Sequence, residues 1–272
     1  MTSGNISFIM ATAVLASVSI LQASEPIVHH VNSTRQSGMT SVRILLPDRL
    51  PGDGEPRLPV VYVLPVEAGD GTRWGDSLAE VQQHDLPNKH HTVFVFPTFS
   101  DLPWYADHAE NTQLQQEAYL LQDVLPLVEH SNPVLKVREG RLLVGFSKSG
   151  WGAWSLLLRH PDVFYRAAAF DAPMMLDAPG QYGSGPIFGT VDNFRRYQVS
   201  NLLEQRATDL RKEPSRLLLI GKGNFQSDHV QVKDRMEALL IPHTWTEGRV
   251  RDHSWHSGWL PEAIDWLTEV SP

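Results

Sequence analysis

The chain has 272 residues, of which 42% are hydrophobic, and it carries a formal net charge of −8 at pH 7. This length and composition suit one large domain, and the acidic balance argues against nucleic acid or an anionic membrane as a partner. Because the sequence contains no cysteine, disulfides, thiolate metal sites and a cysteine nucleophile are excluded.

The N-terminus begins with an apolar run at residues 6–21, which is shorter than a membrane span of about 20 residues. Small residues follow it, so we expect a signal peptide over residues 1–23, cut near Ala23, and a mature domain over residues 24–272. Because no Lys or Arg precedes the run, a retained N-terminal anchor is the alternative. The signal peptide predicts a secreted or periplasmic protein with no stable membrane association after processing.

The rest of the chain alternates between strand-like and helix-like segments. Two strands that could form a hairpin or a near-neighbour pair are expected at residues 26–33 and 40–47. Apolar runs typical of strands buried on both faces follow at residues 58–66, 91–99, 141–146, 165–170 and 215–221. Helices are expected at residues 112–130, 149–160, 228–240 and 259–270. This alternation indicates an α/β fold with a mostly parallel sheet, in which ligands bind at the carboxyl ends of the strands.

Ser147 lies at such a strand end, directly before the helix at residues 149–160. A sharp strand-to-helix turn would expose its hydroxyl above the sheet, and the N–H groups of the new helix would favour a developing oxyanion. Gly145 before the serine, and Ser149 and Gly150 after it, allow the close backbone approach that this turn requires. A serine that only caps a helix needs none of these neighbours. The pattern therefore predicts a nucleophile.

The stretch VGFSKSGWGAWSLLLRHPDVFYRAAAFDAP, residues 144–173, resembles the nucleophile elbow of the α/β-hydrolase fold. More narrowly, it resembles the Putative esterase family, which includes esterase D, feruloyl esterases and the antigen 85 mycolyltransferases. The resemblance extends from about Val42 to the C-terminus. In one departure, Ser149 replaces the last glycine of the usual Gly-x-Ser-x-Gly, and Gly150 comes one place later. The resemblance implies a mostly parallel central sheet flanked by helices and an activity that needs no cofactor.

The base that activates the serine is expected late in the chain, because the chain order in this fold is serine, acid, histidine. Residues 251–259, RDHSWHSGW, offer His253 and His256. The family's ending resembles Gly-His-x-Trp, which selects His253, although Asp252 takes the place of the glycine. His256 is then expected to be a rim residue or a hydrogen-bonding neighbour.

The resemblance places the acid in the loop after the strand at residues 215–221, where the family often has Gly-x-x-Asp-Phe. This chain has Asn224 at the aspartate position. Asp228 is the nearest carboxylate in the expected chain order, so we predict it to be the acid. Asp171, directly after the strand at residues 165–170, could serve instead, and Asn224 could orient the imidazole as a neutral acceptor.

The backbone N–H of Lys148, the residue after the nucleophile, is expected to donate to the oxyanion. The second donor should follow the strand at residues 58–66, where the family commonly has His-Gly and this chain has Pro65 and Val66. Val66 and Glu67 are the candidates. Because its charge would oppose an oxyanion, Glu67 is expected to point away or to pair with a cation.

Aromatic side chains near these residues in sequence are the candidates for substrate binding: Trp104, Trp151 and Trp255. They would suit stacking on sugars or aromatic acyl groups, and they would equally suit a core.

Together these predictions describe a secreted serine ester hydrolase that forms an acyl-enzyme and, by the resemblance, acts on a carbohydrate ester or another small-molecule carboxylic ester. A metal-dependent hydrolase is one alternative, because His253 and His256 could chelate a metal, although no HExxH motif accompanies them. The other is a non-catalytic ligand-binding protein on a hydrolase scaffold, suggested by Asn224 and the altered oxyanion loop. The acyl group, the alcohol and the oligomeric state stay open.

Overall fold

A computed structural model describes residue 1 and residues 25–269 of the chain. The predicted signal peptide, residues 1–23, lies outside the described residues apart from residue 1. Among the described residues, no helix combines the length and the apolar character that crossing a membrane requires.

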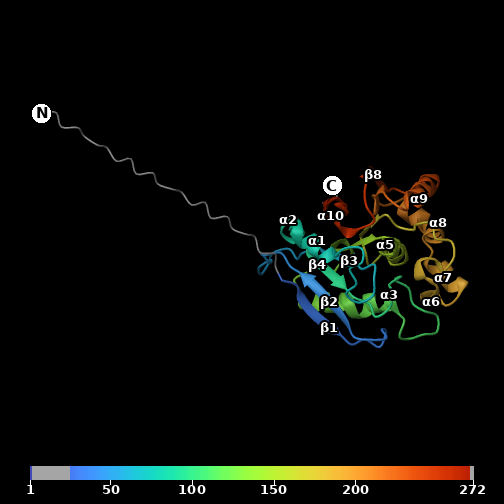
Figure 1. Ribbon diagram of the computed structural model, residues 1–272, viewed down its shortest axis with the longest axis horizontal. Coiled ribbons are helices and arrows are strands. Elements are labelled where there is room, and N and C mark those ends of the chain that lie inside the picture. The colour runs from blue at the N-terminus through green and yellow to red at the C-terminus, as the bar shows by residue number, and fades with distance from the viewer. Residues whose placement is uncertain (2–24, 270–272) are drawn as a thin grey trace.

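The described residues form one eight-stranded sheet with the strand order β1-β2-β4-β3-β5-β6-β7-β8. The strands are β1 (Ile27–Val31), β2 (Thr40–Leu45), β3 (Val60–Leu64), β4 (Val93–Pro97), β5 (Arg141–Phe146), β6 (Arg166–Phe170), β7 (Leu217–Lys222) and β8 (Thr244–Val250). β1 and β2 are antiparallel to each other and β2 is antiparallel to β4, whereas all the other pairs are parallel. β1 lies at one edge of the sheet and β8 at the other (Figure 1). The structure confirms the mostly parallel α/β sheet predicted from the sequence.

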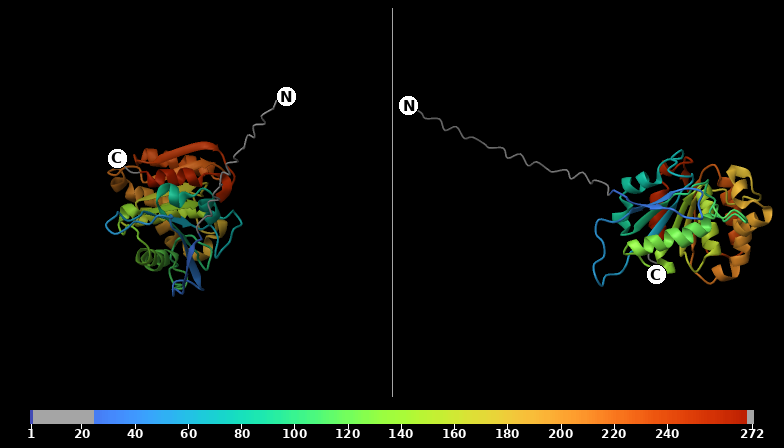
Figure 2. Two further views of the ribbon diagram at one scale, coloured as in Figure 1. Left: turned by 90° about the vertical axis from the view of Figure 1, so that its left-hand side faces the viewer. Right: turned by 90° about the horizontal axis from the view of Figure 1, so that it is seen from below.

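Helices connect the strands and cover both faces of the sheet (Figure 2). They are α1 (Ser77–Gln83), α2 (Leu86–His90), α3 (Gln116–Tyr119), α4 (Leu125–Ser131), α5 (Lys148–Arg159), α6 (Gly185–Phe188), α7 (Val191–Tyr197), α8 (Val199–Leu210), α9 (Gln226–Ala238) and α10 (Leu260–Thr268). Short 3-10 turns are η2 (Arg138–Gly140), η3 (Gln181–Gly183) and η4 (Trp255–Ser257), and η1 (Leu120–Val124) is a π-helical turn between α3 and α4.

The helices α1, α2, α6, α7 and α8 were not predicted from the sequence. Two further differences from the sequence-based expectation have physical reasons. The helix expected at residues 112–130 is broken by η1 directly before α4, which has Pro126 in its first turn. Proline has no N–H to donate into the preceding turn, so the hydrogen-bond ladder changes there. β8 was not expected, because it is an edge strand whose side chains are half-buried or exposed and therefore lack an apolar run.

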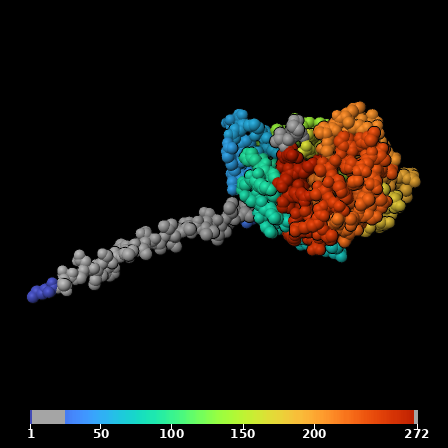
Figure 3. Space-filling view, turned by 90° about the horizontal axis from the view of Figure 1, so that it is seen from above, coloured from blue at the N-terminus to red at the C-terminus, as the bar shows by residue number. Residues whose placement is uncertain are grey.

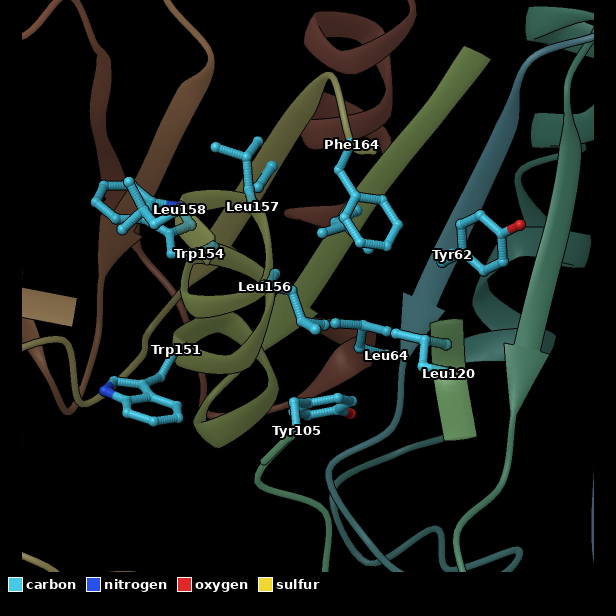
Figure 4. Packing of buried hydrophobic residues seen from close by; sticks show 14 of the residues in the cluster. Tyr62, Leu64, Tyr105, Leu120, Trp151, Trp154, Leu156, Leu157, Leu158 and Phe164 are labelled. Carbon is cyan, nitrogen blue, oxygen red and sulfur yellow. The ribbon is translucent and has the colours of Figure 1, made fainter. Parts of the chain in front are cut away.

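Successive side chains along each central strand point alternately into two hydrophobic cores, one on each face of the sheet. Tyr62 and Leu64 of β3 point into one core, together with residues of α4, α5 and α8, whereas Val61 and Val63 point into the other, together with α1 and α10. Figure 4 shows Tyr62 facing Phe164, and Leu64 beside Leu156 of α5, in the first core. This two-sided burial explains why β3 reads as a continuous apolar run.

The second core packs the C-terminal helix against α1 and α2. α10 buries the amphipathic face formed by Leu260, Ala263, Ile264 and Leu267 and contacts α1 and α2. In the space-filling view, the red C-terminal segment lies beside the green segment of α1 and α2 (Figure 3). The loop that precedes α10 is therefore brought against the loop that precedes α1.

Candidate active site

Ser147 sits between the end of β5 and the start of α5 in a sharply turned backbone, with φ 55° and ψ −132°. Residues other than glycine rarely adopt a positive φ. Those that do occur mainly where the surrounding structure enforces this conformation. The turn needs glycine two residues earlier, since a Cβ at Gly145 would lie 2.1 Å from the carbonyl oxygen of Ser149. Ser147 thus has the conformation that the elbow pattern predicts.

The glycine missing from the elbow pattern is explained by the role of Ser149. Its hydroxyl accepts a hydrogen bond from the N–H of Phe146 at 2.9 Å and donates one to the carbonyl of Phe146 at 2.8 Å. The buried Ser149 therefore braces the turn through both hydrogen bonds. The tight contact with β6 is made instead at Gly150, where a Cβ would lie 3.1 Å from the Cβ of Ala169 in β6 and 2.9 Å from that of Ala172 just after the strand.

His253 is packed against the elbow by three aromatic rings. Its imidazole centroid lies 4.4 Å from the ring of Phe146, 5.0 Å from Trp74 and 5.8 Å from Phe225. The side chain is 11% exposed. The structure therefore brings His253 to the residue that directly precedes Ser147, although the two segments are far apart in the sequence.

Asp171 holds the imidazole in place. Its carboxylate Oδ2 lies 2.5 Å from Nδ1 of His253, and its Oδ1 accepts a hydrogen bond from the N–H of Phe225 at 2.7 Å. Burial raises the pKa of Asp171, but the hydrogen bond from His253 and the backbone donors overcome this effect and bring its pKa below the ordinary value. The pair fixes Nδ1–H as the donor to Asp171 and leaves Nε2 as the nitrogen that can take a proton.

Asp228, the acid predicted from the sequence, does not contact His253 in the structure. Asp228 points elsewhere, because its Oδ2 accepts a hydrogen bond from the N–H of Met175 at 3.0 Å, and burial raises its pKa. The loop that holds Asn224 contributes through its backbone, which donates to Asp171. Gly223 in the same loop lies so close that a Cβ there would be 2.5 Å from the carboxyl carbon of Asp171. The acid of the imidazole pair thus follows β6, and the loop after β7 encloses it.

Of the oxyanion candidates, Lys148 begins α5, and Val66 and Glu67 follow β3. The N–H of Lys148 is the first of that helix, and the first N–H groups of a helix have no partner within it. Glu67 is folded back over its own loop, where Oε2 accepts a hydrogen bond from the N–H of Arg73 at 2.7 Å. Its carboxylate is therefore engaged within the loop, as the sequence required of any carboxylate there. Val66 is buried beside it, and Tyr105 donates a hydrogen bond to the carbonyl of Pro65.

The three tryptophans predicted to bind substrate lie in the cores. Trp104 and Trp151 have no exposed surface and meet edge to face at 5.4 Å, and Figure 4 shows Trp151 beside α5. Trp255 is 3% exposed and stacks on Trp259. The complete burial of Trp104 and Trp151 contradicts the prediction that they bind substrate, whereas Trp255 also lines a small pocket together with Trp74 and Gly75. This burial follows from their large apolar area, which is worth more in a core than at a surface.

Sequence reasoning missed the aromatic residues that do surround the imidazole. Trp74 and Phe225 contact His253, and the half-exposed Tyr182 meets the ring of Phe225 edge on at 5.4 Å. A signal was present in the sequence, because both Trp74 and Phe225 lie in the Gly-containing loops that follow β3 and β7. Such loops lie at the carboxyl edge of a parallel sheet.

His253 and His256, which a metal-dependent hydrolase would use as ligands, have different partners. His253 binds Asp171, whereas Nδ1 of His256 lies 3.0 Å from Glu80. Within residues 25–269, no group of three or more His, Asp or Glu side chains is placed to hold a metal ion.

A comparison with known protein families identifies the family of this chain. The sequence model of the family described as Putative esterase matches residues 33–239 of the chain. The chain belongs to this esterase family. It is therefore a serine ester hydrolase of the α/β-hydrolase fold, and the resemblance seen in the sequence is confirmed.

Solved structures of similar fold include several esterases. FphF, a fluorophosphonate-binding serine hydrolase of Staphylococcus aureus, has a TM-score of 0.73 at 19% identity over 90% of this chain and 98% of its own. A ferulic acid esterase has a TM-score of 0.70 at 19% identity over 90% and 97% of the two chains. An S-formylglutathione hydrolase of Staphylococcus aureus also has a TM-score of 0.70 at 19% identity, over 90% and 98%. No curated protein matches the sequence.

Proposed function

We propose that this esterase uses Ser147, His253 and Asp171 as a catalytic triad and works through an acyl-enzyme. The contact of Asp171 with Nδ1 of His253, beside the elbow residue Phe146, is the observation that carries the proposal. A serine hydroxyl becomes a strong nucleophile only when a neutral imidazole takes its proton, and the carboxylate stabilises the imidazolium that results.

In the first half of the reaction, Oγ of Ser147 attacks the ester carbonyl and its proton passes to Nε2 of His253. The tetrahedral oxyanion accepts hydrogen bonds from the N–H of Lys148 and from that of Val66 or Glu67. When the ester bond breaks, the imidazolium gives its proton to the leaving alcohol and the acyl group stays on Ser147. Water, deprotonated by His253, then attacks the acyl-enzyme, and the acid leaves with Ser147 restored.

The substrate in this proposal is a small-molecule carboxylic ester, and carbohydrate esters are the first class to test. The support is the family together with similar folds whose names include a ferulic acid esterase and an S-formylglutathione hydrolase. The proposal includes export, for which the apolar run at residues 6–21 is the support.

A panel of p-nitrophenyl and sugar esters, with a chelator present in one arm, tests the proposal. Turnover that is insensitive to the chelator and lost in Ser147→Ala is expected, together with a fluorophosphonate adduct located at Ser147 by mass spectrometry. Chelator-sensitive turnover would support the metal-dependent alternative, and absence of both turnover and labelling would support the non-catalytic one. N-terminal sequencing of the protein after expression in its source tests the export.

A further inference from the structure

The segment that carries His253 has no regular secondary structure of its own. It lies between β8 and the short turn η4, and it must be held by contacts with other parts of the chain. Two of these contacts come from Trp74, whose carbonyl accepts hydrogen bonds from the N–H of Trp255 at 2.9 Å and from the hydroxyl of Ser254 at 3.2 Å. The ring of Trp74 in turn contacts His253. The loop before α1, which contains Trp74, therefore holds residues 253–255 in place. Residues 253–256 are called the histidine segment below.

His256 makes a second connection, from the histidine segment to the start of α1. Its Nε2 accepts a hydrogen bond from the N–H of Asp76 at 3.0 Å, and its Nδ1 lies 3.0 Å from Oε2 of Glu80. A backbone N–H can only donate, so Nε2 must carry the lone pair and Nδ1 must carry the proton. Both ring nitrogens of a neutral imidazole are thus engaged with α1 and the residue before it.

The partners of His256 are themselves fixed. Glu80 is 3% exposed, and its other oxygen lies 3.3 Å from Nε2 of His84 one turn along α1. The carboxylate of Asp76 caps α1 by accepting hydrogen bonds from the N–H groups of Leu78 and Ala79. A buried carboxylate that loses a donor is costly, so the helix retains this arrangement.

The ring of His256 also lies close to the backbone of Gly75. A Cβ at Gly75 would lie 2.6 Å from Cδ2 of His256, and Gly75 has a φ of +93°. Only glycine allows both this conformation and this approach. The imidazole is therefore held on one side by Gly75, Asp76 and Glu80, whereas 47% of the His256 side chain is exposed.

We infer that Glu80 and His256 form a positioning pair that sets the place of the catalytic imidazole of His253. This inference rests on the proposed triad. Neither residue touches the reacting atoms, and both act through the backbone of residues 253–256 and through Trp74. Displacing a catalytic group by about 1 Å can cost on the order of 100-fold in rate. Loss of the pair should therefore lower kcat and leave KM nearly unchanged.

Variants of the pair, measured with a neutral p-nitrophenyl ester, test the inference. We expect His256→Ala to lower kcat by about 10- to 100-fold with KM within about twofold. His256→Gln keeps an acceptor for the N–H of Asp76 and should recover part of kcat. Glu80→Ala should resemble His256→Ala, and the double variant should lose little more than either single variant, because both changes remove the same interaction.

His84→Ala is the matched control. His84 contacts the same carboxylate from the same helix but does not reach the histidine segment. We expect His84→Ala to keep kcat within about twofold, so equal losses in His84→Ala and His256→Ala would overturn the inference. So would full activity in His256→Ala.

A spectroscopic measurement separates positioning from general destabilisation. The proton between Nδ1 of His253 and Asp171 should give a downfield proton resonance in the wild type, because that hydrogen bond is short. In His256→Ala, this resonance should shift or broaden at temperatures where circular dichroism shows a folded protein. An unchanged resonance with a lowered melting temperature would assign the pair a purely structural role. If the wild type itself neither turns over esters nor reacts with fluorophosphonate, the proposed function fails instead.

Discussion

Asp171 at the end of β6 lies 2.5 Å from Nδ1 of His253, 82 positions further along the chain. The expected loop after β7 does not supply this carboxylate and instead donates the N–H of Phe225 to it. The two strands are neighbours in the sheet, so an acid at either strand end can reach the same imidazole. An acid that moves from one strand end to the next preserves the geometry of the site while changing its sequence pattern.

The first prediction separates the two candidate acids. Asp171→Asn should lower kcat by up to about 10⁴-fold at neutral pH, because the imidazolium formed in the transition state loses its countercharge. Asp228→Asn should keep kcat within a few-fold, since Asp228 bonds only the N–H of Met175. Steady-state turnover of a p-nitrophenyl ester measures both. A collapse in Asp228→Asn with an active Asp171→Asn would return the acid to the position predicted from the sequence.

A second prediction concerns the loop that encloses Asp171. Gly223→Ala should displace the carboxylate, because the new Cβ would lie 2.5 Å from its carboxyl carbon. We expect a loss of kcat on the order of 100-fold, the cost of about 1 Å of misplacement. Gly52→Ala is the control, since no atom lies within 4 Å of its new Cβ. Near-wild-type kcat in Gly223→Ala would show that the loop gives way without moving Asp171.

The sequence was sufficient where a local pattern sets the geometry of the proposed site. Ser147 could be predicted because a buried strand, small neighbours and a helix follow one another directly, and His253 because a short motif precedes the last helix. For the acid, the sequence left Asp171, Asp228 and Asn224 as candidates. The choice among them depends on which side chain of the loops after β6 and β7 points toward His253, and this is set only when the two strands pair.

The aromatic residues show that residue type and loop position alone do not predict which side chains contact His253. Trp74 and Trp104 are the same residue type in similar loops, yet one contacts His253 and the other is buried in a core. The difference arises from packing between distant segments, such as the contact between α1 and α10, which no local pattern contains. The edge strand β8 was missed for the related reason that an exposed strand has no apolar run to mark it.

A third prediction uses the backbone strain at Ser147. With φ 55° and ψ −132°, a residue with a Cβ is disfavoured by about 1–3 kcal/mol, whereas glycine is not. Ser147→Gly should therefore have a higher free energy of unfolding than Ser147→Ala by about 1 kcal/mol, after the larger entropy of unfolded glycine is subtracted. Urea denaturation of the two inactive variants measures the difference. If the alanine variant is the more stable one, the elbow stores no strain.

The last prediction concerns His229, which is buried and accepts a hydrogen bond from the N–H of Ala172 through Nε2 at 2.9 Å. Burial lowers the pKa of His229 to about 4, although the charge of Asp171 opposes this effect. An unfolded histidine has a pKa of about 6.5. Between these two values the unfolded chain binds a proton that the native protein does not, so the free energy of unfolding falls as the pH is lowered.

The contribution of His229 to stability is therefore complete above about pH 6.5 and is lost progressively as the pH falls toward 4, by up to about 3 kcal/mol. His229→Gln removes the titration and can retain an acceptor for the N–H of Ala172. We expect the free energy of unfolding of this variant to depend less steeply on pH between 4.5 and 6.5 than that of the wild type, in urea titrations at matched pH. Equal slopes would mean that the native protein protonates His229 as readily as the unfolded chain does.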